Sequence, residues 1–281
     1  MYWIRILKIK IFLYVFLSIC LLSSANAYIL KGEHVLQLMI EKNNLPSRLF
    51  INQKISFFDP DIETINTEYD QWVRYQIPEE FRSDIVAYDL KRIQIVSSDN
   101  SLTVIDGTIA AEAEMWVDYY KDIFFCRSRK RLAERLESLG INFSVTSLGR
   151  YNGVICYVLG AEYPDESVPQ LWVAKDTFQP VRWIFEVLDV EGVVEQKEIR
   201  YGDWKSHYNT RYPSKIEFYQ GQNLIQSIAV LQVEINPSFS EDLFDIIQLK
   251  KKYSTEIQEE TDSNVQDNIK KRIEEFKKIY E

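Results

Sequence analysis

Apolar and polar residues alternate along most of the chain, which predicts β-strands with one face buried and the other in water. The alternation is clear over 51–58, 69–77, 92–96 and 102–105. Further runs are separated by short turn sequences: 142–148, 154–159, 170–175, 181–188, 193–201, 212–219 and 224–235. Consecutive strands joined by short turns pair as an antiparallel meander, and a meander of this length must curl.

Two segments carry apolar residues at helical spacing instead. Residues 32–42 form the first, which Pro46 follows closely. Residues 128–139 form the second, with Ser128 placed to cap its start and Gly140 to end it. The stretch 115–125 fits either a helix or a strand. We therefore expect a mainly β protein with two helical interruptions.

The most apolar hairpin is predicted for residues 171–185. Asp176 to Pro180 form its turn, because Asp hydrogen-bonds turn backbone and Pro fixes φ. We expect the strands to pair symmetrically about Phe178, which places six residues on one face: Leu171, Val173, Lys175, Val181, Trp183 and Phe185. This face carries no catalytic residue pattern, so it is either packing surface or a surface that holds an apolar ligand.

The first 27 residues have the layout of a secretory signal peptide. Three basic residues precede an apolar run over 11–22, and the small-residue sequence Ala25-Asn26-Ala27 follows. We expect cleavage after Ala27 and export of the remaining chain to the periplasm. The alternatives are an uncleaved anchor helix, for which the run is short, and a lipid-modified Cys20, which Ile19 disfavours because a small residue is needed there.

The full sequence has a formal charge of −9, and cleavage removes three basic residues and no acidic one. An acidic chain disfavours binding to nucleic acid or to an anionic lipid surface. With 46% hydrophobic residues, the chain can bury one large core. Cys126 and Cys156 remain after cleavage, and export permits a disulfide between them. Cys156 equally fits a buried position in the apolar run 154–159.

The sequence lacks the common signatures of metal and cofactor sites. Its two histidines, His34 and His207, have no metal-ligand spacing, and no Cys-x-x-Cys or nucleotide-binding fingerprint occurs. We expect a protein that is not an enzyme and has no metal and no cofactor. A hydrolase using His207 is the remaining catalytic alternative, because catalytic triads are assembled in space; an ordinary surface-loop histidine is the competing interpretation.

Several motifs taken in order resemble one known family. The most specific is Trp172-Val173-Ala174-Lys175-Asp176-Thr177-Phe178-Gln179-Pro180, and weaker ones lie at 140–141, 147–150, 156–161, 211–216 and 236–244. Together, over roughly 29–244, they resemble the LolA/LolB-like superfamily of periplasmic outer-membrane lipoprotein carriers and sorting proteins.

The resemblance implies an α+β, mainly β fold over residues 28–250: a half-open antiparallel β-barrel with a helical lid. It implies a carrier that sorts lipoproteins towards the outer membrane, with acyl chains in an apolar cavity and transient contact with a membrane complex. We expect nine residues to line that cavity, and ordinary sheet core is the competing interpretation of each: Phe57, Trp72, Ile93, Ile95, Leu171, Val173, Val181, Trp183 and Phe185.

A charged tail over 251–281 departs from the family's shorter carriers. Val265, Ile269, Ile273 and Phe276 recur in it at helical spacing, which predicts an amphipathic helix or a tail that folds on contact. Some members of the superfamily are envelope-stress regulators that sense lipoproteins or lipopolysaccharide. The second hypothesis is therefore a non-catalytic interaction or sensor module whose C-terminal helix docks on an envelope protein.

Overall fold

The computed structural model describes residues 29–58, 65–88, 90–98, 100–111, 114–188 and 192–259. The predicted signal peptide and the apolar positions of the charged tail lie outside these residues. The described strands form one 13-stranded antiparallel sheet in the order β6-β5-β4-β3-β2-β1-β13-β12-β11-β10-β9-β8-β7. Two meanders therefore meet where β1 pairs with β13, and β6 and β7 are the two open edges.

The N-terminal meander consists of β1 (Arg48–Phe58), β2 (Ile65–Gln76), β3 (Glu80–Val86), β4 (Lys91–Ser97), β5 (Asn100–Ile105) and β6 (Thr108–Ile109). The C-terminal meander consists of β7 (Thr146–Tyr151), β8 (Val154–Leu159), β9 (Gln170–Ala174), β10 (Pro180–Leu188), β11 (Val194–His207), β12 (Thr210–Gln220) and β13 (Asn223–Ile235). The predicted strand at 142–148 begins only at Thr146, because residues 142–145 form a turn.

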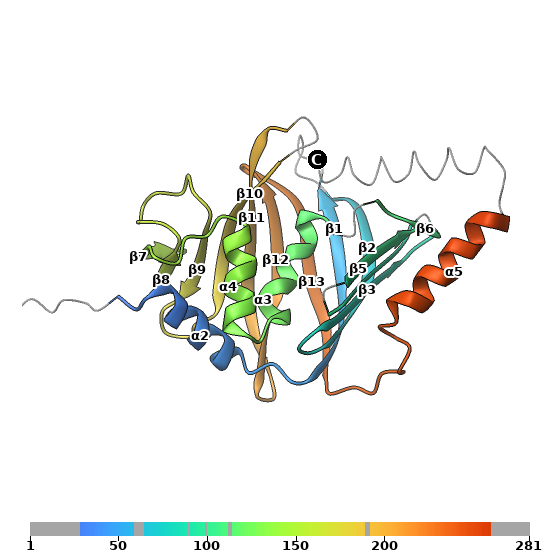
Figure 1. Ribbon diagram of the computed structural model, residues 1–281. Coiled ribbons are helices and arrows are strands. Elements are labelled where there is room, and N and C mark those ends of the chain that lie inside the picture. Colours follow the sequence, from blue (N-terminus) through green and yellow to red (C-terminus); the bar gives the residue numbers. More distant parts are fainter. Residues whose placement is uncertain are drawn as a thin grey trace, which may run out of the picture.

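Helical segments connect the two open edges of the sheet. They are η1, a 3-10 helix (Trp116–Lys121), α3 (Asp122–Phe125) and α4 (Arg129–Ser138). We call residues 116–138 the helical insert. Figure 1 shows the sheet curved around α3 and α4, so the insert lies on its concave face. The stretch 115–125, which the sequence left open, is thus helical.

Local sequence signals account for both ends of α4. The Ser128 side chain accepts a hydrogen bond from the Arg131 backbone N–H at 3.5 Å, as its N-cap position predicts. Gly140 follows the helix with φ +91°, a conformation that disfavours a side chain. A Cβ there would also approach Pro169 Cγ to 2.8 Å. The remaining N-terminal helix, α2 (Gly32–Asn43), buries Val35, Leu36 and Met39 in the same core.

The convex face carries separate apolar clusters. Helix α5 (Ile246–Glu259) lies outside the sheet beside β4, β5 and β6 (Figure 1). Ile246 and Tyr253 of α5, with Phe244 just before it, belong to one apolar cluster on this face. The strands contribute Ile93, Ile95, Leu102 and Val104 to the same cluster. None of the helices in the described ranges has the length and apolar character needed to span a bilayer.

The predicted fold class is confirmed. The protein is mainly β, its antiparallel sheet curves without closing into a barrel, and helices cover the concave face. The alternation of apolar residues explains why the strands form, and the helices explain how the curved sheet buries its apolar face without closing on itself. Its concave face is covered by the chain's own helices.

Candidate functional site

The concave face of the C-terminal meander is mainly apolar, although the buried Lys197 lies on it opposite Phe185, with Nζ 5.4 Å from the centroid of the Trp116 ring. Leu171, Val173, Trp183 and Phe185 are each 0% exposed and belong to one core cluster that also contains Phe57. Cross-strand pairing of Leu171 with Trp183 places both on the same face. The structure therefore brings together five of the nine expected lining residues.

The predicted pairing of the 171–185 hairpin is wrong in register. Leu171 pairs with Trp183 and Val173 with Pro180, and the ladder shifts between Pro180 and Arg182. An irregularity of this kind turns the residue within it towards the opposite face. Val181 consequently packs with Trp172 in a cluster on the convex side.

Three other expected lining residues also lie on the convex face. Trp72 pairs opposite Asp84, which pairs opposite Ile93, and Ile95 shares the side of Ile93 on β4. The cluster around α5 covers Ile93 and Ile95. The structure does not bring Trp72, Ile93, Ile95 or Val181 to the concave face.

Aromatic side chains of the helical insert occupy the concave face. The Trp116 ring lies 6.1 Å from the Phe185 ring and 6.1 Å from the Phe218 ring, measured between centroids. The Phe124 ring lies 4.8 Å from that of Tyr212. These insert residues were not singled out from the sequence. Their signal was the aromatic content of 115–125, whose conformation was undecided.

Ion pairs hold the other side of the insert. Arg92 of β4 pairs with Asp118 of η1 at 2.7 Å, and both side chains are buried. Lys121 pairs with Glu114 and, at 3.4 Å, with Asp122. Burial by itself would lower the pKa of Lys121, but the surrounding carboxylates outweigh burial and raise it. The buried ammonium group therefore stays charged and binds the insert together.

Four buried tyrosines lie between the insert and the sheet. The hydroxyl groups of Tyr75 and Tyr212 are 3.5 Å apart. Burial raises the pKa of Tyr120 to about 12. It also raises the pKa values of Tyr75, Tyr201 and Tyr212 well above the usual value of a tyrosine. All four phenols are neutral at physiological pH, so they act as aromatic packing with weak hydrogen-bonding ends.

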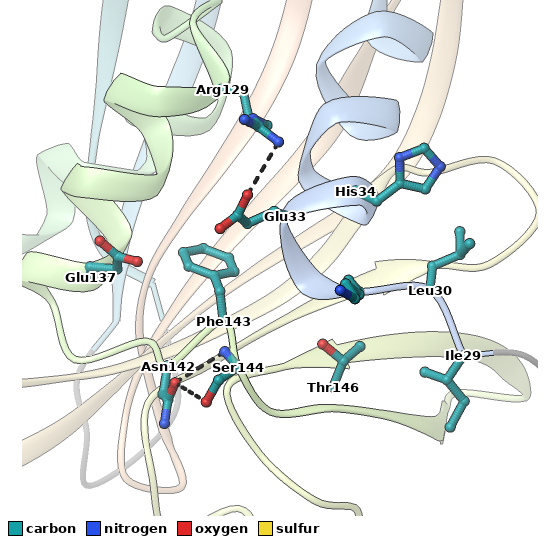
Figure 2. Close-up of a pocket in the computed structure, with 11 residues that line it drawn as sticks. Ile29, Leu30, Glu33, His34, Arg129, Glu137, Asn142, Phe143, Ser144 and Thr146 are labelled. Carbon is teal, nitrogen blue, oxygen red and sulfur yellow. Dashed lines mark hydrogen bonds and ion pairs between the residues drawn. The ribbon is translucent and has the colours of Figure 1, made fainter.

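An open hollow lies where α2 approaches the start of β7. It is an open groove of about 820 Å³. Figure 2 shows Glu33 of α2 facing Arg129 of α4, and these two side chains form an ion pair at 3.2 Å. Among the lining residues, Asn142 Oδ1 accepts hydrogen bonds from the Ser144 N–H and hydroxyl. Charges of both signs and apolar side chains line this groove, so it has no single chemical character.

The described residues contain no group of three or more His, Cys, Asp or Glu side chains placed to hold a metal ion. His207 ends β11 beside a turn, and burial together with Lys205 lowers its pKa. Cys126 and Cys156 are both free thiols. Burial raises the pKa of Cys126 to about 12 and that of Cys156 to about 11, so neither is a reactive thiolate at neutral pH.

Neither a protein-family model nor a curated protein matches this chain by sequence. Many solved structures match it in fold, and two of them are LolA-like. A LolA superfamily protein from Nitrosomonas europaea has a TM-score of 0.53 at 14% identity, covering 78% of this chain and 99% of that one. A putative outer membrane lipoprotein-sorting protein domain from Vibrio parahaemolyticus has a TM-score of 0.52 at 9% identity, covering 78% and 98%. The chain therefore has a LolA-like fold, which confirms the family resemblance at the level of fold.

Proposed function

We propose that this protein binds a lipid or an acylated lipoprotein in the periplasm, with the acyl chains on the concave face, and carries or sorts it towards the outer membrane. The observation that carries the proposal is the contact of Trp116 with Phe185 and Phe218. Aromatic side chains of a separate segment fill the apolar half of a curved sheet. The LolA-like fold and the signal-like residues 1–27 support the same function.

Binding requires the helical insert to move, because the apolar residues beneath it are fully buried. Displacement uncovers Leu171, Val173, Trp183 and Phe185 together. Each acyl methylene that takes the place of the insert recovers about 0.8 kcal/mol. Part of one acyl chain therefore offsets much of the free energy lost when the insert leaves the apolar surface. Acyl chains and insert side chains then compete for one surface, which gives a carrier a means of release.

The chemistry of the insert suits reversible movement. Its charged side chains, Asp118, Lys121 and Asp122, gain hydration when the insert leaves the sheet, which offsets part of the cost of breaking the Arg92–Asp118 ion pair, while the pairs of Lys121 with Glu114 and Asp122 move with the insert. A wholly apolar insert would have no such compensation. The site offers apolar contact without an arrangement for bond making, so we propose binding and not catalysis.

Two buried valines on neighbouring strands provide a matched test. Val173 of β9 is on the concave face and Val158 of β8 is on the convex face, and both are 0% exposed. A Val→Thr change adds one buried hydroxyl at either position with little change of shape. Delipidated mature protein would be titrated with a dansyl-labelled diacylated lipopeptide.

We expect Val173→Thr to weaken lipopeptide binding severalfold, because the hydroxyl faces the acyl chain, and Val158→Thr to leave binding unchanged. Thermal unfolding of both variants controls for the shared loss of stability. Equal effects of the two substitutions, or no uptake by the wild-type protein, would contradict the proposed site.

A further inference from the structure

A stripe of buried polar side chains crosses the otherwise apolar concave face of the N-terminal meander. Five side chains on the adjacent strands β1 to β5 are between 0% and 4% exposed, and we call them the polar stripe: Gln53, Gln71, Ser83, Gln94 and Thr103. Gln53 pairs opposite Gln71, and Gln94 pairs opposite both Ser83 and Thr103. Ser83 also lies opposite the core residue Val73, which places the stripe on the concave side.

Hydrogen bonds link part of the polar stripe to the insert. Gln53 Nε2 donates to Gln71 Oε1 at 2.5 Å and to the Tyr120 hydroxyl oxygen at 3.3 Å. Gln71 Nε2 donates to Ser83 Oγ at 2.5 Å. The Tyr120 ring in turn packs on Phe218, with centroids 6.0 Å apart. Tyr120 of the insert thus contacts both the polar stripe and the apolar part of the concave face, and its displacement uncovers both.

Several buried polar atoms on this face have no hydrogen-bond partner in the part of the chain that the structure describes. In the polar stripe they are Gln53 Oε1 of β1 and Gln94 Nε2 of β4, and further along the sheet they are Gln226 Oε1 of β13 and Trp183 Nε1 of β10. Gln226 of β13 pairs opposite Phe57 and Phe218, so it lies on the same concave face. A buried donor or acceptor without a partner is costly, and native proteins keep few of them without a reason such as a ligand or an ordered water.

The spare groups of the polar stripe itself are uncharged: Gln53 Oε1 is an acceptor and Gln94 Nε2 is a donor. The charged neighbour Arg92 is already paired with Asp118 at 2.7 Å. A carboxylate or ammonium head buried at the stripe would lose its hydration, while the adjacent Arg92 and Asp118 charges are already engaged with each other. An amide carries a C=O, the partner for a donor such as Gln94 Nε2, and an N–H, the partner for an acceptor such as Gln53 Oε1, and it stays neutral.

We propose that the polar stripe and its neighbours bind the uncharged amide head of an acyl ligand, such as the amide joining an acyl chain to a peptide. The acyl chain itself lies on the apolar concave face of the C-terminal meander. This inference rests on the proposed function and specifies its ligand: an amide-linked acyl chain in preference to a free fatty acid or a bare hydrocarbon.

The test compares two ligands of similar length, dodecanamide and tridecane, in competition with the dansyl lipopeptide for the delipidated mature protein. We expect the wild-type protein to prefer dodecanamide. Gln94→Leu should reduce that preference by about threefold to tenfold, the amount typical of one hydrogen bond, while tridecane binds as before. Gln94→Met serves as a second variant if Gln94→Leu folds poorly, and dodecanoic acid should bind more weakly than dodecanamide.

Gln232→Leu is the matched control, because Gln232 is exposed and lies opposite Asn52 on the convex face. It should leave the preference unchanged. Equal affinity of the wild-type protein for the two ligands, or a preference that survives both Gln94 substitutions, would overturn this inference and leave the proposed function standing. Binding of neither ligand, nor of the lipopeptide, would overturn both.

Discussion

Trp116 of the helical insert packs against Phe185 of β10 with ring centroids 6.1 Å apart and an interplanar angle of 61°. Phe185 is fully buried, and Trp116 is only 7% exposed. This edge-to-face contact joins a segment that connects the two open edges of the sheet to the most apolar strand pair beneath it. The same contact stabilises the closed protein and blocks the surface that we propose for acyl chains.

Trp116→Ala should therefore destabilise the protein and improve ligand uptake. Loss of a buried tryptophan costs about 3–5 kcal/mol of unfolding free energy, which urea unfolding would measure. The space left on Phe185 should raise the affinity for the dansyl lipopeptide severalfold. Trp72→Ala, on the convex face, is the control and should not raise it. If the Trp116→Ala protein folds and binds the lipopeptide no better than the wild-type protein, the insert does not block the binding site and the prediction is wrong.

Removal of α5 should expose an apolar surface on the outside of the sheet. A chain ending at residue 240 lacks the segment that covers Ile93, Ile95, Leu102 and Val104. We expect it to self-associate and to bind a hydrophobic dye, as measured by size-exclusion chromatography with light scattering. A chain ending at residue 254 keeps Phe244, Ile246 and Tyr253, and it should self-associate and bind dye no more than the full-length mature protein. A monomeric 240 truncation would show that α5 is dispensable.

The acid side of the stability curve should depend on Glu198. This buried carboxylate accepts hydrogen bonds from Arg182 at 2.6 and 3.0 Å and also from Arg200. Burial would raise its pKa, but the two guanidinium groups outweigh burial and lower the pKa below the usual 4.5. A lowered folded-state pKa gives stability that is present above the unfolded-state pKa and is lost as pH falls through the folded-state value.

We therefore expect Glu198→Gln to reduce the unfolding free energy at neutral pH and to flatten its decline on acidification. Urea unfolding from about pH 7 to about pH 3 would measure both. Glu234→Gln, in an exposed position, should follow the wild-type curve. Parallel curves for Glu198→Gln and the wild-type protein would contradict this assignment.

Local signals in the sequence predicted most of the elements. The apolar run 154–159 corresponds to β8, and the Ser128 cap and Gly140 bound α4 as expected. These features depend on neighbouring residues alone, so alternation and capping patterns suffice. The short edge strand β6 and the strand β3 were not singled out, because neither has a distinctive apolar alternation.

The sequence could not tell which face of β4 would be concave. Ile93 and Ile95 lie on one face and Arg92 and Gln94 on the other, so the apolar face was expected inside. Helix α5 covers the isoleucines from outside, while ion pairs and amides occupy the inside. Such a reversal depends on contacts between distant segments. Val181 was misplaced for a related reason, since the irregular pairing beside Pro180 is not visible in residue alternation.

The central claim is that an acyl ligand takes the place of the helical insert. Hydrogen–deuterium exchange of the delipidated mature protein, with and without a diacylated lipopeptide, tests it most directly. Bound ligand should speed amide exchange over residues 116–125 and leave β9 and β10 protected. Unchanged or increased protection of residues 116–125 in the ligand-bound protein would contradict the claim, because the insert would then still lie on the concave face.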